Sequence, residues 1–336
     1  MRRIMVREGP ETNPMSSEEN VFDYRDAVGD DPAEIAVDTR SFEVDESLHG
    51  QRLDKAMVVH APEFSRSHLQ TLIDRGLVRV DGVAASSASR KLRLGQSVAM
   101  ELRPTEESRA FVPQAMTLNV IFEDEHLLVI DKPAGLVVHP APGNWQGTLL
   151  NGLLARHADA SRLARAGIVH RLDKDTSGLM VVARTLEAMT VLARAIAARE
   201  VRREYLALVH GEVSAVPFEI DAPIGRDPVS RIRMAVVSGG RPSRTGVTRI
   251  GFDGAVSAVR CRLHTGRTHQ IRVHLASRGH PLVGDALYGG RPALGMSRQA
   301  LHAARLGFVH PATGRPVDLE TPLPTDMADA WGRVTR

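Results

Sequence analysis

Cysteine is nearly absent from this chain, and long apolar runs are absent altogether. The 336 residues include one cysteine, Cys261. A single cysteine excludes internal disulfides and zinc ribbons, and it fits a protein of the reducing cytoplasm. No stretch approaches the roughly eighteen uncharged apolar residues of a membrane-spanning helix. The first residues, MRRIMVREGPETN, lack the apolar core of a secretory signal. We therefore expect a cytoplasmic protein with no membrane segment.

Patterns that bind nucleotides or metals are also missing. The glycine pairs do not belong to a GxxxxGK or GxGxxG pattern, and they are typical of turns. His264, His269 and His274 recur every five residues, a spacing that shares no face of a helix or a strand. The segment HRLDK superficially resembles a kinase catalytic loop, but no DFG follows it. The sequence thus predicts neither a metal nor a nucleotide cofactor.

Charge is distributed unevenly along the chain. Residues 1–46 contain thirteen acidic and five basic residues, a net charge of −8. The remaining 290 residues carry +11, from 38 basic and 27 acidic residues. Residues 1–46 are poor in apolar periodicity, which is typical of a disordered acidic tail. A basic body favours a polyanionic partner, although a solvated basic surface is also common.

Residues 47–103 are predicted to form a compact module. A short helix is expected over Arg52–His60, and Ser65 is a candidate N-cap for a second helix that ends at Gly76. LVRV, a turn at Asp81–Gly82 and SVAMEL predict a small sheet. RLDK, SRSHLQTLIDRGLVRVDG and LRLGQSV in this module resemble the RNA-binding module shared with a small-subunit ribosomal protein, the S-four type.

Basic side chains of this module are candidate contacts to RNA phosphates. Some lie on the second helix, away from its apolar face, and others lie on the segments around it. Positive side chains on a small, well-packed module suit contact with a nucleic-acid backbone. The candidates are Arg52, Arg66, His68, Arg75, Arg79, Lys91 and Arg93.

The remainder of the chain is predicted to form one large domain. Residues 104–117 are predicted to be a linker, and residues 118–330 mix strands and helices without a regular alternation. LLVIDK and AVSAVRCRLH are expected strands, and LEAMTVLARAIAARE is an amphipathic helix rich in Ala and Leu. This pattern predicts an α+β domain around a mixed sheet.

The segment IVHRLDKDTSGLMVVAR, residues 168–184, has the densest polar loop. It places His170, Arg171 and Asp173 between two apolar strands, as in a shaped site, although acids in such a loop also cap turns and pair with Arg171 or Lys174. HRLDKDTSGLMVVAR resembles the signature of the ribosomal large-subunit pseudouridine synthases, the family that includes RluA, RluC and RluD. The order of module and domain is most similar to the RluD branch. Three further blocks resemble this family: EDEHLLVIDKPAGLVVHPAPGN, LHTGRTHQIRVHLASRGHPLVGDALYG and LHAARLGFVHPATGRPV.

The resemblance implies a reaction and a set of roles. It implies isomerisation of selected uridines in structured RNA, with large-subunit ribosomal RNA as the expected partner and a monomeric enzyme. Asp173 matches the catalytic aspartate, which can attack the ribose C1′ or deprotonate C2′. Arg267 matches the arginine that pairs with it, and Tyr205 matches an aromatic residue that stacks on the base or moves a proton at C5. His170 and Arg171 are expected to support this site. Product and substrate are isomers, so no cofactor is expected.

Two other function classes fit parts of the same pattern. A hydrolase could use Asp173 and Asp175 as a carboxylate pair on a glycosidic bond, and it would release free uracil. A non-catalytic RNA-binding ribosome-assembly factor would keep its full function after Asp173→Ala. The acidic residue in a site for a phosphate-rich ligand favours an enzyme over a simple binder.

Overall fold

The computed structural model describes residues 38–103, 110–141, 143–230 and 232–336. These residues form two compact units, an N-terminal unit that ends before residue 110 and a C-terminal unit that begins at Ala110. Within the described ranges, no helix is long and apolar enough to span a membrane.

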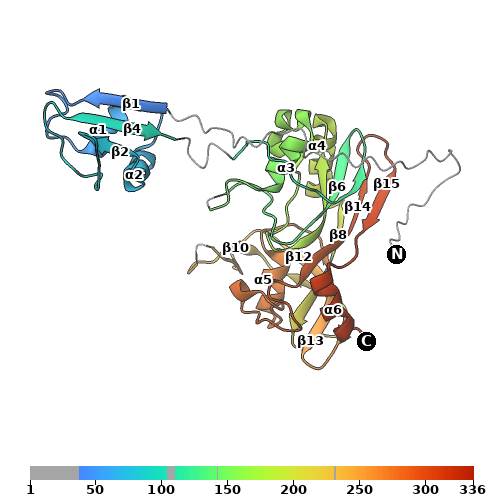
Figure 1. The fold of residues 1–336 in the computed structure, drawn as a ribbon. Coiled ribbons are helices and arrows are strands. Elements are labelled where there is room, and N and C mark those ends of the chain that lie inside the picture. The colour runs from blue at the N-terminus through green and yellow to red at the C-terminus, as the bar shows by residue number, and fades with distance from the viewer. Residues whose placement is uncertain (1–37, 104–109, 142, 231) are drawn as a thin grey trace. The chain divides into compact units, whose positions relative to one another are not determined.

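The N-terminal unit packs two helices against a four-stranded antiparallel sheet (Figure 1). Its elements are β1 (Asp38–Glu43), α1 (Leu53–His60), α2 (Arg66–Asp74), β2 (Val78–Val80), β3 (Val83–Ala84) and β4 (Ser97–Leu102). Strand order is β1-β4-β2-β3. The Ser65 hydroxyl caps α2 by accepting the His68 N–H at 3.2 Å, and Asp81 and Gly82 turn with positive φ. The helices, the cap and the turn predicted from the sequence are confirmed.

The predicted boundary of the acidic tail was wrong. Residues 38–43 form β1, which pairs along its whole length with β4, so the module begins about nine residues earlier than expected. Phe42 packs on the module core and stacks on His60 with ring centroids 3.9 Å apart. The strand was missed because an edge strand with alternating polar residues looks like part of an acidic tail. Residues 1–37 of the predicted tail lie outside the described residues.

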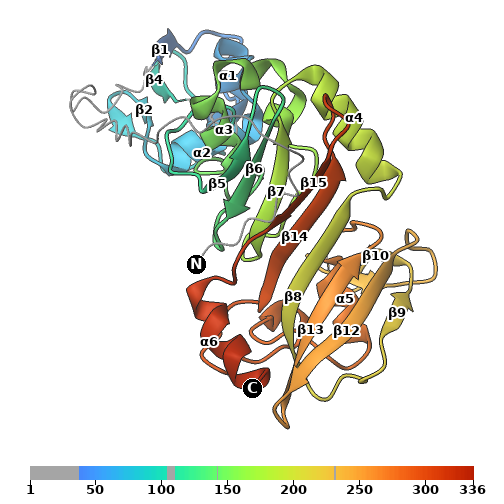
Figure 2. The same ribbon diagram turned by 90° about the vertical axis from the view of Figure 1, so that its right-hand side faces the viewer.

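The C-terminal unit is built around a nine-stranded mixed sheet (Figure 2). Its strand order is β5-β6-β7-β14-β8-β13-β12-β9, with β15 paired to β14; β7 and β14 are parallel, and the other pairs are antiparallel. A separate hairpin joins β10 (Ile224–Arg226) to β11 (Met234–Val236). The strands of the large sheet are β5 (Val120–Glu123), β6 (Leu127–Lys132), β7 (Ser177–Ala183), β8 (Arg202–His210), β9 (Phe218–Asp221), β12 (Arg244–Phe252), β13 (Val256–Leu263), β14 (Leu301–Val309) and β15 (Pro316–Glu320).

Helices cover both faces of this sheet. Leu128 and Ile130 of β6 pack in one core with α3 and α5, whereas Leu127 and Val129 pack in another core with α4. Helix α6 packs on the same side as α4, against Leu208 of β8. The expected α+β mixed-sheet fold is confirmed. The helical elements are α3 (Leu149–Arg156), η3 (Ala158–Arg162), η4 (Ala164–Gly167), α4 (Leu186–Ala197), α5 (Gln270–Ser277), η5 (Ala286–Tyr288) and α6 (Thr325–Val334).

Both predicted ends of the large domain need correction. Buried Asn151 of α3 donates hydrogen bonds to the carbonyl oxygens of Ala110 (3.1 Å) and Val112 (2.8 Å). Residues 110–117 are therefore part of the domain, and of the predicted linker only residues outside the described ranges remain. At the other end, α6 continues past residue 330 and buries Val334 in the core. The first extension was missed because residues 110–117 form no helix or strand, and their hydrogen bonds to Asn151 are made by backbone carbonyls.

Candidate active site

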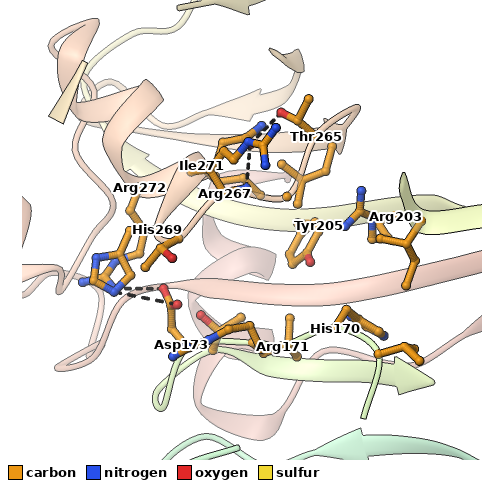
Figure 3. Close-up of a pocket in the computed structure, with 18 of the residues that line it drawn as sticks. His170, Arg171, Asp173, Arg203, Tyr205, Thr265, Arg267, His269, Ile271 and Arg272 are labelled. Atoms are coloured by element: carbon orange, nitrogen blue, oxygen red, sulfur yellow. Dashed lines mark hydrogen bonds and ion pairs between the residues drawn. The ribbon is translucent and has the colours of Figure 1, made fainter. Parts of the chain in front are cut away.

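A cavity of about 490 Å³ opens on the sheet face covered by α3 and α5. The loop before β7, strand β8 and the loop that leads into α5 line it (Figure 3). Among the described residues, six arginines line the cavity, whereas Asp173 is its one carboxylate. Only Arg272 among the six makes an ion pair with a described residue. The arginines are Arg165, Arg171, Arg199, Arg203, Arg267 and Arg272.

Two cationic side chains hold the backbone of the Asp173 loop. Lys132, fully buried at the end of β6, donates to the Lys174 carbonyl at 2.9 Å and to two carbonyls of its own turn. Burial lowers the pKa of Lys132 to about 8. Arg298 donates to the Asp175 carbonyl at 2.9 Å and forms a two-bond ion pair with Asp326 of α6. The backbone of the loop that carries Asp173 is thus held by one cation that precedes it in the sequence, Lys132, and one that follows it, Arg298.

The Asp173 carboxylate is oriented by Arg272 of α5. Nη1 of Arg272 donates to Asp173 at 2.9 Å, while Nε and Nη2 donate to Asp285 at 2.7 and 2.9 Å. The Tyr288 ring lies beneath the guanidinium, 5.0 Å from its centre. Burial alone would lower the pKa of Arg272, but its bonds to Asp285 and the charge of Asp173 raise it above the usual range. Arg272 is therefore a fixed cation that presents one N–H to Asp173.

The predicted partner of Asp173 was wrong. Arg267 lines the cavity, but the structure pairs Asp173 with Arg272, five residues further along. The backbone N–H of Arg267 is bound by Gln270, and its buried Nε has no hydrogen-bond partner among the described residues. His269 also lies beside Asp173, with Nε2 3.8 Å from the carboxylate, but burial lowers the pKa of the imidazole and favours its neutral form. The sequence placed the cation in the right motif but at the wrong position, because the motif does not show which of its arginines bonds to Asp173.

Tyr205, which the resemblance assigns to the active site, lies on β8 and lines the cavity. It is 6% exposed, and burial raises the pKa of its phenol to about 12. At neutral pH the hydroxyl is therefore protonated and can donate a hydrogen bond.

Arg171 is exposed at the cavity and has no ion pair with a described residue.

The side chain of His170 accepts a hydrogen bond from the backbone of the sheet. Its Nε2 accepts the Val181 N–H of β7 at 3.0 Å, so the ring must be neutral at that nitrogen. Burial, aided by the charge of Arg203, lowers the pKa of His170 to about 3. His170 lines the cavity, but its contacts place it as a support of the loop.

A pH experiment tests that role. A histidine whose folded pKa is depressed stabilises the fold fully above its ordinary pKa of 6.5, and that contribution is lost as the pH falls toward 3. From pH 7 to pH 5, the free energy of unfolding of the native protein should fall by up to about 2 kcal/mol more than that of His170→Gln. Urea denaturation of both proteins at the two pH values measures this difference. Parallel decreases in the two proteins would contradict the assignment.

The sequence-based prediction missed Arg272, Asp285, Arg203 and Lys132. One signal for Arg203 was available: it precedes Tyr205 by two residues, and strand residues two apart share a face. No comparable signal marks Asp285, because its role depends on a tertiary contact with α5.

Some of the basic residues predicted to bind RNA in the N-terminal module bond within the module, and others lie exposed at its surface. Arg52 and Arg66 both bond to the fully buried Asp54, at 3.0 and 2.8 Å, and these bonds hold the pKa of that carboxyl well below its usual range. His68 stacks on Phe64 and bonds to the carbonyl of Arg103. Four candidates lie at the module surface: Arg75, Arg79, Lys91 and Arg93.

Comparisons with known proteins agree with this arrangement. Residues 126–277 match the family profile of RNA pseudouridylate synthases, and residues 51–98 match that of the S4 domain. Over 293 residues the chain is 48% identical to a protein of Nitrosomonas europaea, with 85% of each chain covered. Over 301 residues it is 47% identical to a protein of Pseudomonas aeruginosa, with 86% of this chain and 93% of that one covered. The chain therefore belongs to the RNA pseudouridine synthases, which isomerise uridine in RNA to pseudouridine.

The relatives and the solved structures refine this class. Both relatives carry the name ribosomal large subunit pseudouridine synthase D. The structure of human RNA pseudouridylate synthase domain containing 1 is 28% identical, with a TM-score of 0.50 over 68% of this chain and 90% of that one. Human RNA pseudouridylate synthase domain containing 4 shares the fold, with a TM-score of 0.51 at 24% identity over 64% of this chain and 92% of that one.

Proposed function

We propose that this enzyme isomerises selected uridines of large-subunit ribosomal RNA and that Asp173 carries the reaction. The observation that most supports this is a single carboxylate, fixed by Arg272, among the described residues of a cavity lined by six arginines. The arginines attract a polyanion, and the carboxylate can act as a nucleophile or a base. The relatives named above act on large-subunit ribosomal RNA by name.

The reaction moves one bond and one proton. The C1′–N1 bond of uridine breaks, a C1′–C5 bond forms, and C5 loses the proton that N1 gains. Asp173 begins this sequence either by attacking C1′ or by taking a proton from C2′. Arg272 holds the carboxylate in one orientation, so both routes start from the same geometry.

Tyr205 is proposed to hold the detached base. Its ring can stack on uracil, and its protonated hydroxyl can donate a hydrogen bond to a base oxygen. The raised pKa of this phenol disfavours a phenolate base at neutral pH. We therefore assign Tyr205 to binding of the base during its rotation.

The substrate is proposed to be a loop of large-subunit RNA during subunit assembly in the cytoplasm, bound by a monomeric enzyme. The target nucleotide must leave its stack to reach Asp173, and unstacking costs least in loops. The test offers purified enzyme isolated large-subunit RNA, assembled subunits and bulk transfer RNA, and then maps new pseudouridines in each. We expect modification of isolated large-subunit RNA. Modification of transfer RNA alone would overturn the substrate assignment, and release of free uracil would identify the hydrolase.

The S4 domain is proposed to anchor the RNA backbone. Substituting Arg79, Lys91 and Arg93 together by Gln should weaken RNA binding and lower the log–log salt slope by roughly 0.7 to 0.9 for each phosphate that is no longer neutralised. Filter binding at several salt concentrations measures the slope. Arg162→Gln is the control, because Arg162 is 83% exposed in the catalytic domain and pairs with Asp159. A slope equal to that of the native enzyme would show that these three residues do not contact RNA.

A further inference from the structure

Arg203 of β8 is a buried cation with no anionic partner among the described residues. It is 6% exposed and lines the active-site cavity on the same face of the strand as Tyr205. Its Nε is buried without a hydrogen bond, and no ion pair joins the side chain to any described residue. A buried guanidinium that lacks an anion is costly, and folded proteins avoid it unless a ligand supplies the anion.

This guanidinium lies against a glycine, Gly266. A Cβ added at Gly266 would lie only 2.7 Å from Nη1 of Arg203. The absence of a side chain therefore makes room for the cation beside the loop that leads into α5. The next residue, Arg267, also lines the cavity and also has a buried Nε without a hydrogen bond. The cavity thus has two arginines that no described carboxylate pairs with: Arg203, whose guanidinium lies against Gly266, and Arg267, which follows Gly266 in the chain.

We propose that Arg203 and Arg267 bind a phosphodiester next to the target uridine, seated against Gly266. This rests on the proposed function and assigns a residue pair to the RNA backbone inside the cavity. A phosphodiester carries a permanent negative charge, whereas the oxygens of uracil are neutral before the glycosidic bond breaks. Of these groups only the phosphate supplies a negative charge to the two guanidiniums in the bound ground state, and a guanidinium fork matches its oxygens.

The unbound enzyme provides a test that needs no RNA. Arg203→Met removes an uncompensated buried charge and keeps most of the apolar volume, so the melting temperature should not fall and should rise by a few degrees in anion-free buffer. Sulfate should raise the melting temperature of the native protein more than it raises that of the Arg203→Met variant. Arg202→Met is the control for unspecific salt effects, because Arg202 points to the other face and pairs with Glu204 at 2.6 Å. A large drop in the melting temperature of Arg203→Met, or equal sulfate effects in all three proteins, would overturn the proposal.

A cycle between protein and substrate identifies the ligand. A stem-loop that the native enzyme modifies is synthesised with a neutral methylphosphonate at the linkage before or after the target uridine. One of these changes should lower kcat/KM of the native enzyme roughly 10- to 100-fold, and Arg203→Met should cause a similar decrease on the unmodified stem-loop. When Arg203→Met acts on the methylphosphonate stem-loop, kcat/KM should fall by less than about a further threefold, because the two changes remove the same interaction.

The outcomes separate the possible errors. If the decreases in kcat/KM from Arg203→Met and from the methylphosphonate were additive at both linkages, the phosphate assignment would be overturned. Arg203 would then be assigned to binding of the base. Gly266→Ala keeps the charge but displaces the guanidinium, so it should reproduce part of the decrease in kcat/KM and respond less to the methylphosphonate. Native activity in both Arg203→Met and Gly266→Ala would also overturn the proposal. Failure of the native enzyme to modify any stem-loop would instead contradict the proposed function.

Discussion

Asp173→Asn is expected to abolish pseudouridine formation, lowering kcat/KM by roughly 10⁴-fold or more, as removal of a nucleophile or general base does in other enzymes. The amide has the size of the carboxylate but supplies neither a nucleophilic oxygen nor a base. The fold should persist, because Arg272 keeps its two bonds to Asp285. The measurement is tritium release from [5-³H]uridine in RNA, with circular dichroism as the check on folding.

Asp175→Asn is the matched control for Asp173. Asp175 follows two residues later, is absent from the cavity lining and contributes a backbone carbonyl to Arg298. Its substitution should change kcat/KM only severalfold. Equal decreases in the two variants would favour the carboxylate pair of a hydrolase, and activity of Asp173→Asn within tenfold of the native level would refute the role of Asp173.

Arg272→Met is expected to affect stability and activity together. Asp285 is 1% exposed and would lose both of its bonds to the guanidinium, so the free energy of unfolding should fall by about 3–5 kcal/mol. Asp173 would lose its orienting bond in the same step. Urea denaturation and single-turnover kinetics measure the two effects separately.

Two further variants separate orientation from stability. Arg272→Lys keeps a charge but cannot bond to Asp173 and Asp285 at once, and a misplaced carboxylate should cost roughly 10²-fold in rate. Arg267→Met should lower activity while leaving stability near the native value, since Arg267 has no ion pair with a described residue. If Arg267→Met destabilised the fold as much as Arg272→Met, the assignment of the two arginines would have to be exchanged.

The predictability of this site differs from residue to residue. Asp173 and Tyr205 were found from motif blocks, and the structure places both at one cavity. Arg272 was missed because its partner lies 99 residues away in the sequence, and the direction in which α5 presents an arginine depends on packing. Lys132 was missed for a related reason: its partners are backbone carbonyls, which leave no trace in side-chain patterns.

The fold shows the same division between local and distant determinants. The cap at Ser65 and the turn at Asp81–Gly82 follow from local chemistry and were predicted correctly. Strand β1 and residues 110–117 were assigned to a tail and a linker, because neither sequence pattern reveals the backbone bonds that these segments form with distant parts of the chain. Both errors occurred where tertiary pairing determines the local structure.

The bond between Arg298 and the Asp175 carbonyl has a consequence for biosynthesis. Arg298 is itself held by Asp326, so the loop of Asp173 depends on a helix made more than a hundred residues after it. A nascent chain that has not yet reached Asp326 lacks this anchor, although Asp173 and Tyr205 are already present. Because interactions so distant in sequence form late, the catalytic geometry is completed only after α6 has left the ribosome. A nascent chain that ends before α6 should therefore be unable to modify the RNA around it, even though it already contains the catalytic aspartate.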